Sequence, residues 1–180
     1  MSDKRTGGCL CGAVRYESEG EPVFSLQCHC RDCQRSSGTA YIAAMRVPAA
    51  GFRITQGAPK RYVGKADSGN EIIRAFCGDC GSPLWVQVST RPDIVGLRVG
   101  SLDDPSIFCP EADIFVKSAQ PWDHMDPALP KYDTYPPGQS YPRAALNIPN
   151  EQLTLSSRGL LAHGLDPWRS RDPFIRRSNS

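Results

Sequence analysis

Cys77-Gly78-Asp79-Cys80-Gly81, together with Cys9-Leu10-Cys11-Gly12 near the start of the chain, is the stretch that decides the fold. A C-x-x-C motif followed by glycine is typical of a metal-binding knuckle, because two sulfurs converge on one cation. The glycine allows the positive φ that turns backbone N–H groups towards the thiolates. In a Cys-x-Cys motif, alternate residues of an extended segment project to the same side and can also share a metal. We therefore predict a closed, structural zinc site with four ligands, Cys9, Cys11, Cys77 and Cys80. The alternative is a set of buried free cysteines.

Such a site would tie the beginning of the chain to a hairpin more than sixty residues away. Structural zinc in small peptides contributes ~10–16 kcal/mol of apparent binding free energy near neutral pH. Even a fraction of that is large beside the ~5–15 kcal/mol by which a domain is normally stable. Zinc therefore explains how a chain with 16 glycines and 16 prolines can hold a fixed fold.

A second cluster, Cys28-His29-Cys30-Arg31-Asp32-Cys33, differs from the first in its ligand count. Cys28, Cys30 and Cys33 supply three thiolates and leave a tetrahedral metal one ligand short. Structural zinc sites are closed, whereas catalytic ones keep an open position. His29 lies between two ligands and should point away from their metal, so we expect it to pack or to support the site. A thiol from outside that reached the open position would be ionised by the metal, which predicts a site for thiol substrates.

Two alternatives remain for this cluster. The fourth ligand can be a distant side chain such as His124, Asp113 or Cys109, which would make the site a second structural zinc. The three cysteines can also form a disulfide in the absence of metal. Cys109 stands alone before Pro110, and we expect it otherwise to be a small buried hydrophobe.

Charge and hydropathy argue against a nucleic-acid-binding protein and against a membrane protein. The 180 residues include 21 Lys and Arg against 19 Asp and Glu, a formal charge of +2, so nucleic acid is an unlikely partner. The longest apolar run, 40–45, has six residues, and we expect no membrane span. The polar first eight residues hold no apolar export segment. We expect a cytoplasmic protein, whose 8 cysteines stay reduced, bind metal or do chemistry.

Short β segments separated by turn residues predict a mainly β fold. Helical signals are few, and the best are at residues 31–37 and in a short piece after Asp103-Asp104-Pro105, where proline suits a first helical turn. The expected strands are 13–17, 39–47, 52–55, 60–63, 71–76, 84–88, 94–99 and 114–116.

The composition changes near Gln120. Residues 121–142 are rich in proline and contain no run that favours a regular element, and the chain beyond Ser156 is rich in arginine. Asp166-Pro167-Trp168 and Asp172-Pro173-Phe174 place two aromatic side chains on this tail. We expect residues 136–180 to form a loop-rich extension docked on a domain made by residues 1–135, and a motif for a peptide-binding partner is the alternative.

Three ordered cysteine signatures carry a family resemblance. The stretches 7–16, 28–33 with Gly38, and 76–84 resemble the glutathione-dependent formaldehyde-activating enzyme family, which includes centromere protein V. Gly100-Ser101-Leu102-Asp103-Asp104-Pro105, Pro121-Trp122 and Leu129-Pro130 support the likeness, which covers roughly residues 7–135.

The resemblance implies a β-tent fold, in which twisted antiparallel sheets gather at the zinc of Cys9, Cys11, Cys77 and Cys80. It implies a second zinc on Cys28, Cys30 and Cys33, near which glutathione binds, with Cys30 nearest the substrate sulfur as the catalytic residue. The family reaction adds the glutathione thiol to formaldehyde and is classed with the carbon–sulfur lyases.

The resulting hypothesis is a lyase with two zinc ions per chain that acts on a thiol adduct of glutathione type. Arg31, Arg35 and Lys117 are weak candidates for binding glutathione carboxylates, and solvated surface charge is the simpler interpretation. One rival is a zinc domain without catalysis that binds protein or nucleic acid. Another is a redox or metal sensor whose middle cluster cycles between thiolate and disulfide. The sequence does not indicate an oligomeric state.

Overall fold

The computed structural model describes residues 4–66 and 69–138. These residues fall in one compact unit, Met1–Leu146. The extension predicted for 136–180, with Trp168 and Phe174, lies outside the described residues except for its first three positions.

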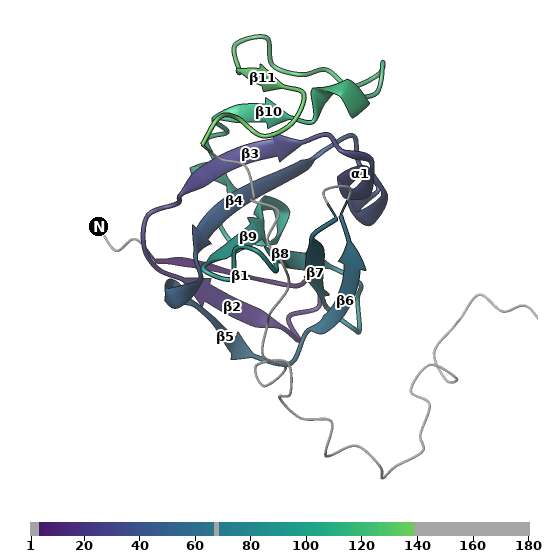
Figure 1. Ribbon diagram of the computed structural model, residues 1–180. Helices are drawn as coiled ribbons and strands as arrows, with labels where there is room; N and C mark the ends of the chain where they lie inside the picture. Colours follow the sequence, from purple (N-terminus) through teal and green to yellow (C-terminus); the bar gives the residue numbers. More distant parts are fainter. Residues whose placement is uncertain (1–3, 67–68, 139–180) are drawn as a thin grey trace, which may run out of the picture. The chain divides into compact units, whose positions relative to one another are not determined.

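Two twisted β-sheets make up the fold (Figure 1). The smaller sheet has the strand order β1-β2-β5, with β1 (Arg5–Gly8), β2 (Arg15–Ser18) and β5 (Phe52–Gln56). The larger sheet has the order β11-β10-β3-β4-β9-β8-β7-β6. Its strands are β3 (Phe24–Cys28), β4 (Ile42–Pro48), β6 (Lys60–Lys65), β7 (Glu71–Phe76), β8 (Pro83–Val88), β9 (Ile94–Arg98), β10 (Ala112–Ile114) and β11 (Lys131–Tyr132). The mainly β fold predicted from the sequence is confirmed.

The pairing of the strands is antiparallel except around β10, which runs parallel to both β3 and β11. The strand predicted at 114–116 lies two residues earlier in the structure. β10 ends at Ile114, and the short helix η4 (Val116–Ser118) follows it. β1, β3 and β11 are additions to the predicted set, and β11 lies within the proline-rich stretch for which no regular element was expected.

Helical structure is sparse, as predicted. α1 (Arg31–Ser37) is capped at its N-terminus by Cys30, whose sulfur accepts a hydrogen bond from the Cys33 amide, and at its C-terminus by Gly38 in the left-handed conformation. The piece expected after Asp104 is η3 (Pro105–Ile107), capped by the Asp104 carboxylate. The remaining short helices are η1 (Ala49–Gly51) and η2 (Val99–Ser101). None of the helices in the described part of the chain is long and apolar enough to cross a membrane.

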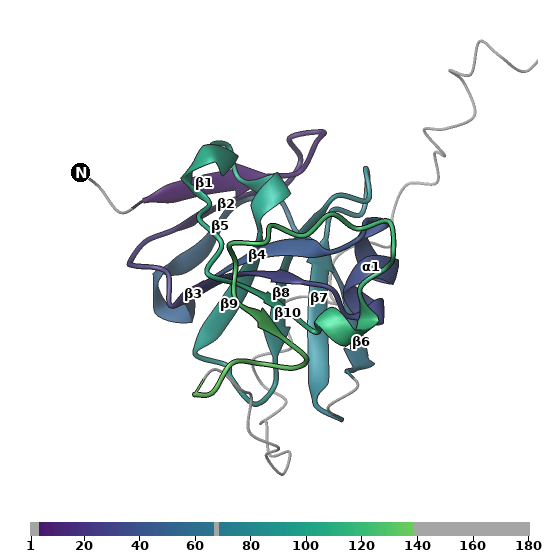
Figure 2. The same cartoon turned by 90° about the horizontal axis from the view of Figure 1, so that it is seen from above.

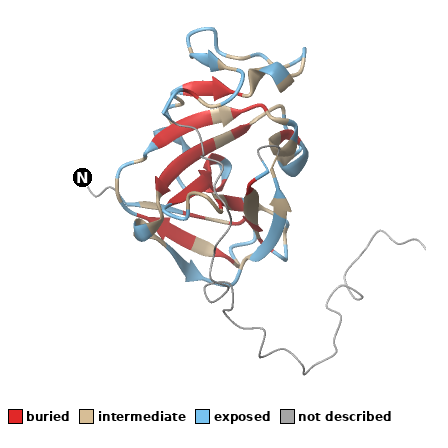
Figure 3. Cartoon of the chain, in the orientation of Figure 1, coloured by how far each residue is buried: buried red, intermediate tan, exposed pale blue. Residues whose placement is uncertain are grey.

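The main core lies where the two sheets meet. Tyr16 of β2 and Phe52 of β5 pack on Trp85 of β8, with ring centroids 5.9 Å and 4.8 Å from that of Trp85. The two central strands β4 and β9 are almost entirely buried, whereas β5 and β6 are largely exposed (Figure 3). A view turned by 90° shows α1 beside β6 and β7, away from the smaller sheet (Figure 2). The fold thus leaves α1 and the end of β3 at one side of the larger sheet.

Candidate metal centre

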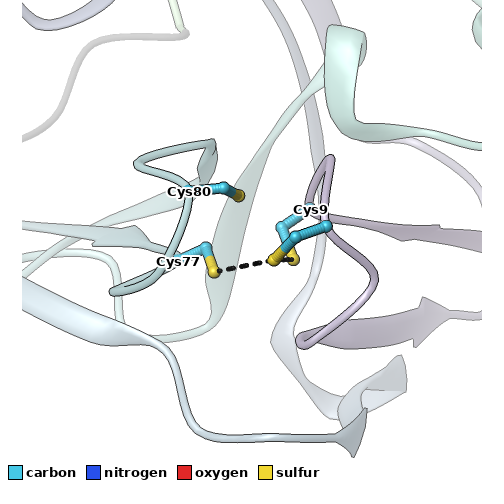
Figure 4. Close-up of side chains that lie close together, drawn as sticks. Cys9, Cys77 and Cys80 are labelled. Carbon is cyan, nitrogen blue, oxygen red and sulfur yellow. Dashed lines mark hydrogen bonds between the residues drawn. The ribbon is translucent and has the colours of Figure 1, made fainter. Parts of the chain in front are cut away.

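The first four predicted ligands come together from two loops that belong to different sheets. Cys9 and Cys11 lie in the β1–β2 loop, and Cys77 and Cys80 lie in the β7–β8 loop. Their four sulfurs lie within 4.8 Å of one another, and the labelled cysteines of Figure 4 point their sulfurs into one space. Cys11 Sγ lies 3.5 Å from Cys9 Sγ and 3.7 Å from Cys77 Sγ.

Backbone turns rather than extended segments aim these sulfurs. The expectation of an extended Cys-x-Cys was wrong, because Leu10 and Cys11 form a turn in which the Gly12 amide donates to the Cys9 carbonyl at 3.1 Å. Gly12 has a φ of +77° and Gly81 a φ of +75°, as the knuckle interpretation requires. The Gly81 amide donates to the Cys77 carbonyl at 3.0 Å, so both loops close tightly around their cysteines.

The donor set fits zinc. Four sulfurs around an ion at 2.3 Å would be about 3.8 Å apart in a regular tetrahedron, close to the separations found here. Cys9 and Cys77 are buried and Cys11 is exposed. The Val14 amide donates to Cys9 Sγ at 3.2 Å, and the hydrogen bond with the Ser82 hydroxyl lowers the pKa of Cys80 to about 5, which favours the thiolate at Cys80. This cluster can hold a metal ion.

The second cluster gathers at the N-terminal end of α1. Cys28 is the last residue of β3, Cys30 precedes the helix and Cys33 lies in its first turn, and their three sulfurs lie within 4.8 Å of one another. Hydrogen bonds from the Cys28 and Cys33 thiols lower the pKa of Cys30 to about 3. The pKa of the Cys28 thiol is raised, chiefly by its hydrogen bond with Cys30.

The distant side chains considered as a fourth ligand lie elsewhere. Cys109 and His124 are exposed, and the carboxylate of Asp113 is hydrogen-bonded to His29. Within residues 4–66 and 69–138, the group of close ligand atoms at this site consists of the three sulfurs. Cys109 also corrects a prediction, because it is an exposed thiol and not a buried hydrophobe.

Two carboxylates hold His29, which lies between Cys28 and Cys30 in the sequence. Its ring is fully buried, with Nδ1 2.7 Å from Asp123 Oδ2 and Nε2 3.1 Å from Asp113 Oδ1. The Gln34 side chain donates to the His29 carbonyl at 2.7 Å. Both ring nitrogens are therefore occupied, and His29 has the packing role that the sequence predicted.

Two arginines that sequence reasoning missed lie beside the sulfurs. Arg74 of β7 and Arg98 of β9 border a cavity of 70 Å³ together with Cys28 and Cys33. Burial lowers the pKa of Arg98, while the neighbouring Cys33 thiol acts in the opposite direction. The signal was present in the sequence: Arg98 is the one charged residue of the otherwise apolar strand β9. The three cations named from the sequence are exposed, and one of them, Arg31, is bonded to Gln34.

Two larger cavities adjoin this region. One of 420 Å³ lies between α1, β6 and β7, and Arg35, Arg74 and Arg98 are part of its lining. Another cavity, of 640 Å³, lies between the β1–β2 loop and the start of β4, and Arg98 also borders it. Arg98 therefore stands where the three cavities approach one another.

Three comparisons relate this chain to known proteins. A protein of Halomonas elongata named "Putative glutathione-dependent formaldehyde-activating enzyme" is 27% identical over 101 residues, which make up 54% of this chain and 64% of that protein. A solved structure of a Rhodobacter sphaeroides protein is 25% identical and covers 54% of this chain and 87% of its own, with a TM-score of 0.45. The family profile described as "Glutathione-dependent formaldehyde-activating enzyme" matches residues 4–118, which include all seven clustered cysteines. Because this match extends over more than half of the chain, the protein belongs to the glutathione-dependent formaldehyde-activating enzyme family.

Proposed function

We propose that this protein is a zinc-dependent carbon–sulfur lyase that forms or cleaves a thiol adduct of glutathione with formaldehyde. The observation that carries the proposal is the cluster of Cys28, Cys30 and Cys33, in which three sulfurs converge without a fourth ligand among the described residues. Family membership supplies the substrate class, and the sulfur ligands favour zinc over harder metals.

In this proposal the first cluster has a structural role and the second a catalytic one. Cys9, Cys11, Cys77 and Cys80 would hold a structural zinc that joins two loops, and Cys28, Cys30 and Cys33 would hold a second zinc. A zinc ion held there would supply positive charge that favours the ionised form of a thiol bound to it. His29, fixed by two carboxylates, keeps the segment between Cys28 and Cys30 in place. Arg98 offsets negative charge on the sulfurs.

The reaction needs little more than proximity and an ionised sulfur. The glutathione sulfur forms a bond to the carbonyl carbon of formaldehyde, the π electron pair moves to the oxygen, and that oxygen takes a proton. The product is S-hydroxymethylglutathione. In the lyase direction the carbon–sulfur bond breaks and the same proton leaves. We place this activity in the cytoplasm, where the thiols stay reduced.

Metal analysis and ligand titration test the proposal. Close to two zinc ions per chain are expected, together with calorimetric binding of glutathione that is lost in Cys30→Ser and kept in the control Cys109→Ser. Exchange of labelled formaldehyde with S-hydroxymethylglutathione, followed by NMR, should be faster than in buffer. One zinc per chain that resists chelators, or no binding of glutathione, would contradict the proposal.

Other outcomes identify the rivals. A chain that binds zinc but no small thiol would be an interaction domain. A second cluster that releases its zinc on mild oxidation and recovers it on reduction, without catalysing exchange, would be a redox sensor.

A further inference from the structure

Arg74 and Arg98 project from the same face of the larger sheet. Arg74 is in register with Val86 of β8, and Val86 is in register with Gly96 of β9. Arg98 lies two residues beyond Gly96 and so points to the same side. Val86 and Gly96, which lie between the two arginines in this register, border the 70 Å³ cavity with them.

Positive charge in this region exceeds the carboxylates that could balance it. Arg35, Lys65, Arg74 and Arg98 line the 420 Å³ cavity, and Asp32 is the one acidic side chain in that lining. Asp32 lies 3.5 Å from Arg74 Nη2, and the distance suits a loose ion pair. Arg98 is 8% exposed, and no carboxylate of the described residues lies within ion-pair distance of it.

Arg74 also carries an unused donor. Its Nε is buried and has no hydrogen-bond partner among the described residues. A buried donor without a partner costs free energy, and a buried guanidinium costs more. A carboxylate that accepts two parallel hydrogen bonds from a guanidinium would satisfy this donor.

The two arginines connect the cavity with the sulfurs. On one side they line the 420 Å³ cavity, and on the other they border the small cavity with Cys28 and Cys33. A small molecule whose sulfur reached the second cluster would therefore bring its other end near the guanidinium groups.

We propose that Arg74 and Arg98 bind a carboxylate of the substrate, so that the protein selects low-molecular-weight thiols that carry a negative charge. This inference rests on the proposed function for the position of the sulfur. It adds a specificity-determining site formed by two strand residues.

Calorimetry with three small thiols tests the inference on the zinc-loaded full chain. Mercaptopropionate carries a carboxylate, mercaptoethanol is neutral and cysteamine carries an amine. Mercaptopropionate should bind at least about tenfold more tightly than mercaptoethanol, because hydrogen bonds to charged groups are strong, and cysteamine should bind most weakly. Arg74→Gln should bring the first two affinities together by weakening mercaptopropionate alone, and Arg74→Lys should lie between.

Arg61→Gln is the matched control, because Arg61 is an exposed arginine on the neighbouring strand β6 and lines none of the three cavities. Every variant should keep the zinc content of the parent, which shows that it folds. Equal affinities for the three thiols, or an Arg74→Gln variant that weakens them all alike, would overturn the inference while leaving thiol binding intact; the arginines would then only balance charge on the sulfurs.

S-methylglutathione separates this inference from the proposed function, since it has both carboxylates but no free thiol. If no thiol binds and S-methylglutathione still binds in a manner that depends on Arg74, the proposed function fails and the carboxylate site stands. If neither the thiols nor S-methylglutathione bind, the proposed function and the carboxylate site are both wrong.

Discussion

Nδ1 of His29 lies 2.7 Å from Oδ2 of Asp123, and both side chains are almost completely removed from solvent. This contact joins the segment between two predicted zinc ligands to a loop 94 residues further along the chain. The position of the second cluster therefore depends on a loop that supplies none of its sulfurs.

Asp123→Ala should lower the free energy of unfolding by about 1–3 kcal/mol, because it leaves a buried ring nitrogen without a partner. It should also weaken zinc at the second cluster without affecting the first. Denaturant unfolding and metal analysis measure the two effects. Asp133→Ala, at an exposed carboxylate, should change neither. Wild-type stability in Asp123→Ala would show that water replaces the carboxylate.

The two clusters should respond differently to mutation. Cys77→Ser should destabilise the fold by several kcal/mol, because structural zinc contributes ~10–16 kcal/mol in small domains. Cys33→Ser should remove the second zinc and leave a cooperative unfolding transition. Thermal unfolding and zinc content of the two variants provide the comparison. Equal loss of stability in both would mean that the second site is structural as well.

Tyr16 gives a prediction about pH. Burial raises the pKa of Tyr16 to about 12, with the hydrogen bond to Ser101 acting in the opposite direction. An unfolded tyrosine has a pKa of about 10, so the folded state favours the neutral phenol. That contribution to stability is complete below about pH 10 and is lost as the pH rises towards 12. Absorbance titration of tyrosinate should show one late step, absent in Tyr16→Phe, and a titration unchanged by this substitution would contradict the assignment.

Cys109 should be the readily alkylated thiol of the zinc-loaded protein, because it is exposed and belongs to neither cluster. Mass spectrometry after brief treatment with iodoacetamide should find one modification, which disappears in Cys109→Ser. That substitution should leave stability and zinc content unchanged. Fast labelling of Cys11 in the loaded protein would argue against metal at the first cluster.

The sequence predicted the elements whose residues carry a local signal. α1 lies where residues 31–37 gave the best helical signal, and the buried strands β4 and β9 follow from the apolar stretches at 39–47 and 94–99. β3 could have been found, since Phe24, Leu26 and Cys28 alternate with polar residues. β1 contains two glycines and owes its existence to its partner β2, which no local pattern reveals.

The sites divide in the same way. The cysteine clusters are visible because the ligands of each knuckle are neighbours in the sequence. The carboxylates that hold His29 are 84 and 94 residues away, and the fold alone brings them together. Arg74 and Arg98 lie on strands that flank β8. Their spacing in the sequence therefore could not predict that they line one cavity.

The four-sulfur cluster takes one pair of cysteines from a loop of the smaller sheet and one pair from a loop of the larger sheet. Metal binding there and the packing of Tyr16 and Phe52 against Trp85 are therefore thermodynamically linked, because each brings the same two sheets together. A substitution that weakens this aromatic contact should therefore also lower the affinity of the four sulfurs for metal. Removing the metal should likewise weaken the packing of the aromatic core.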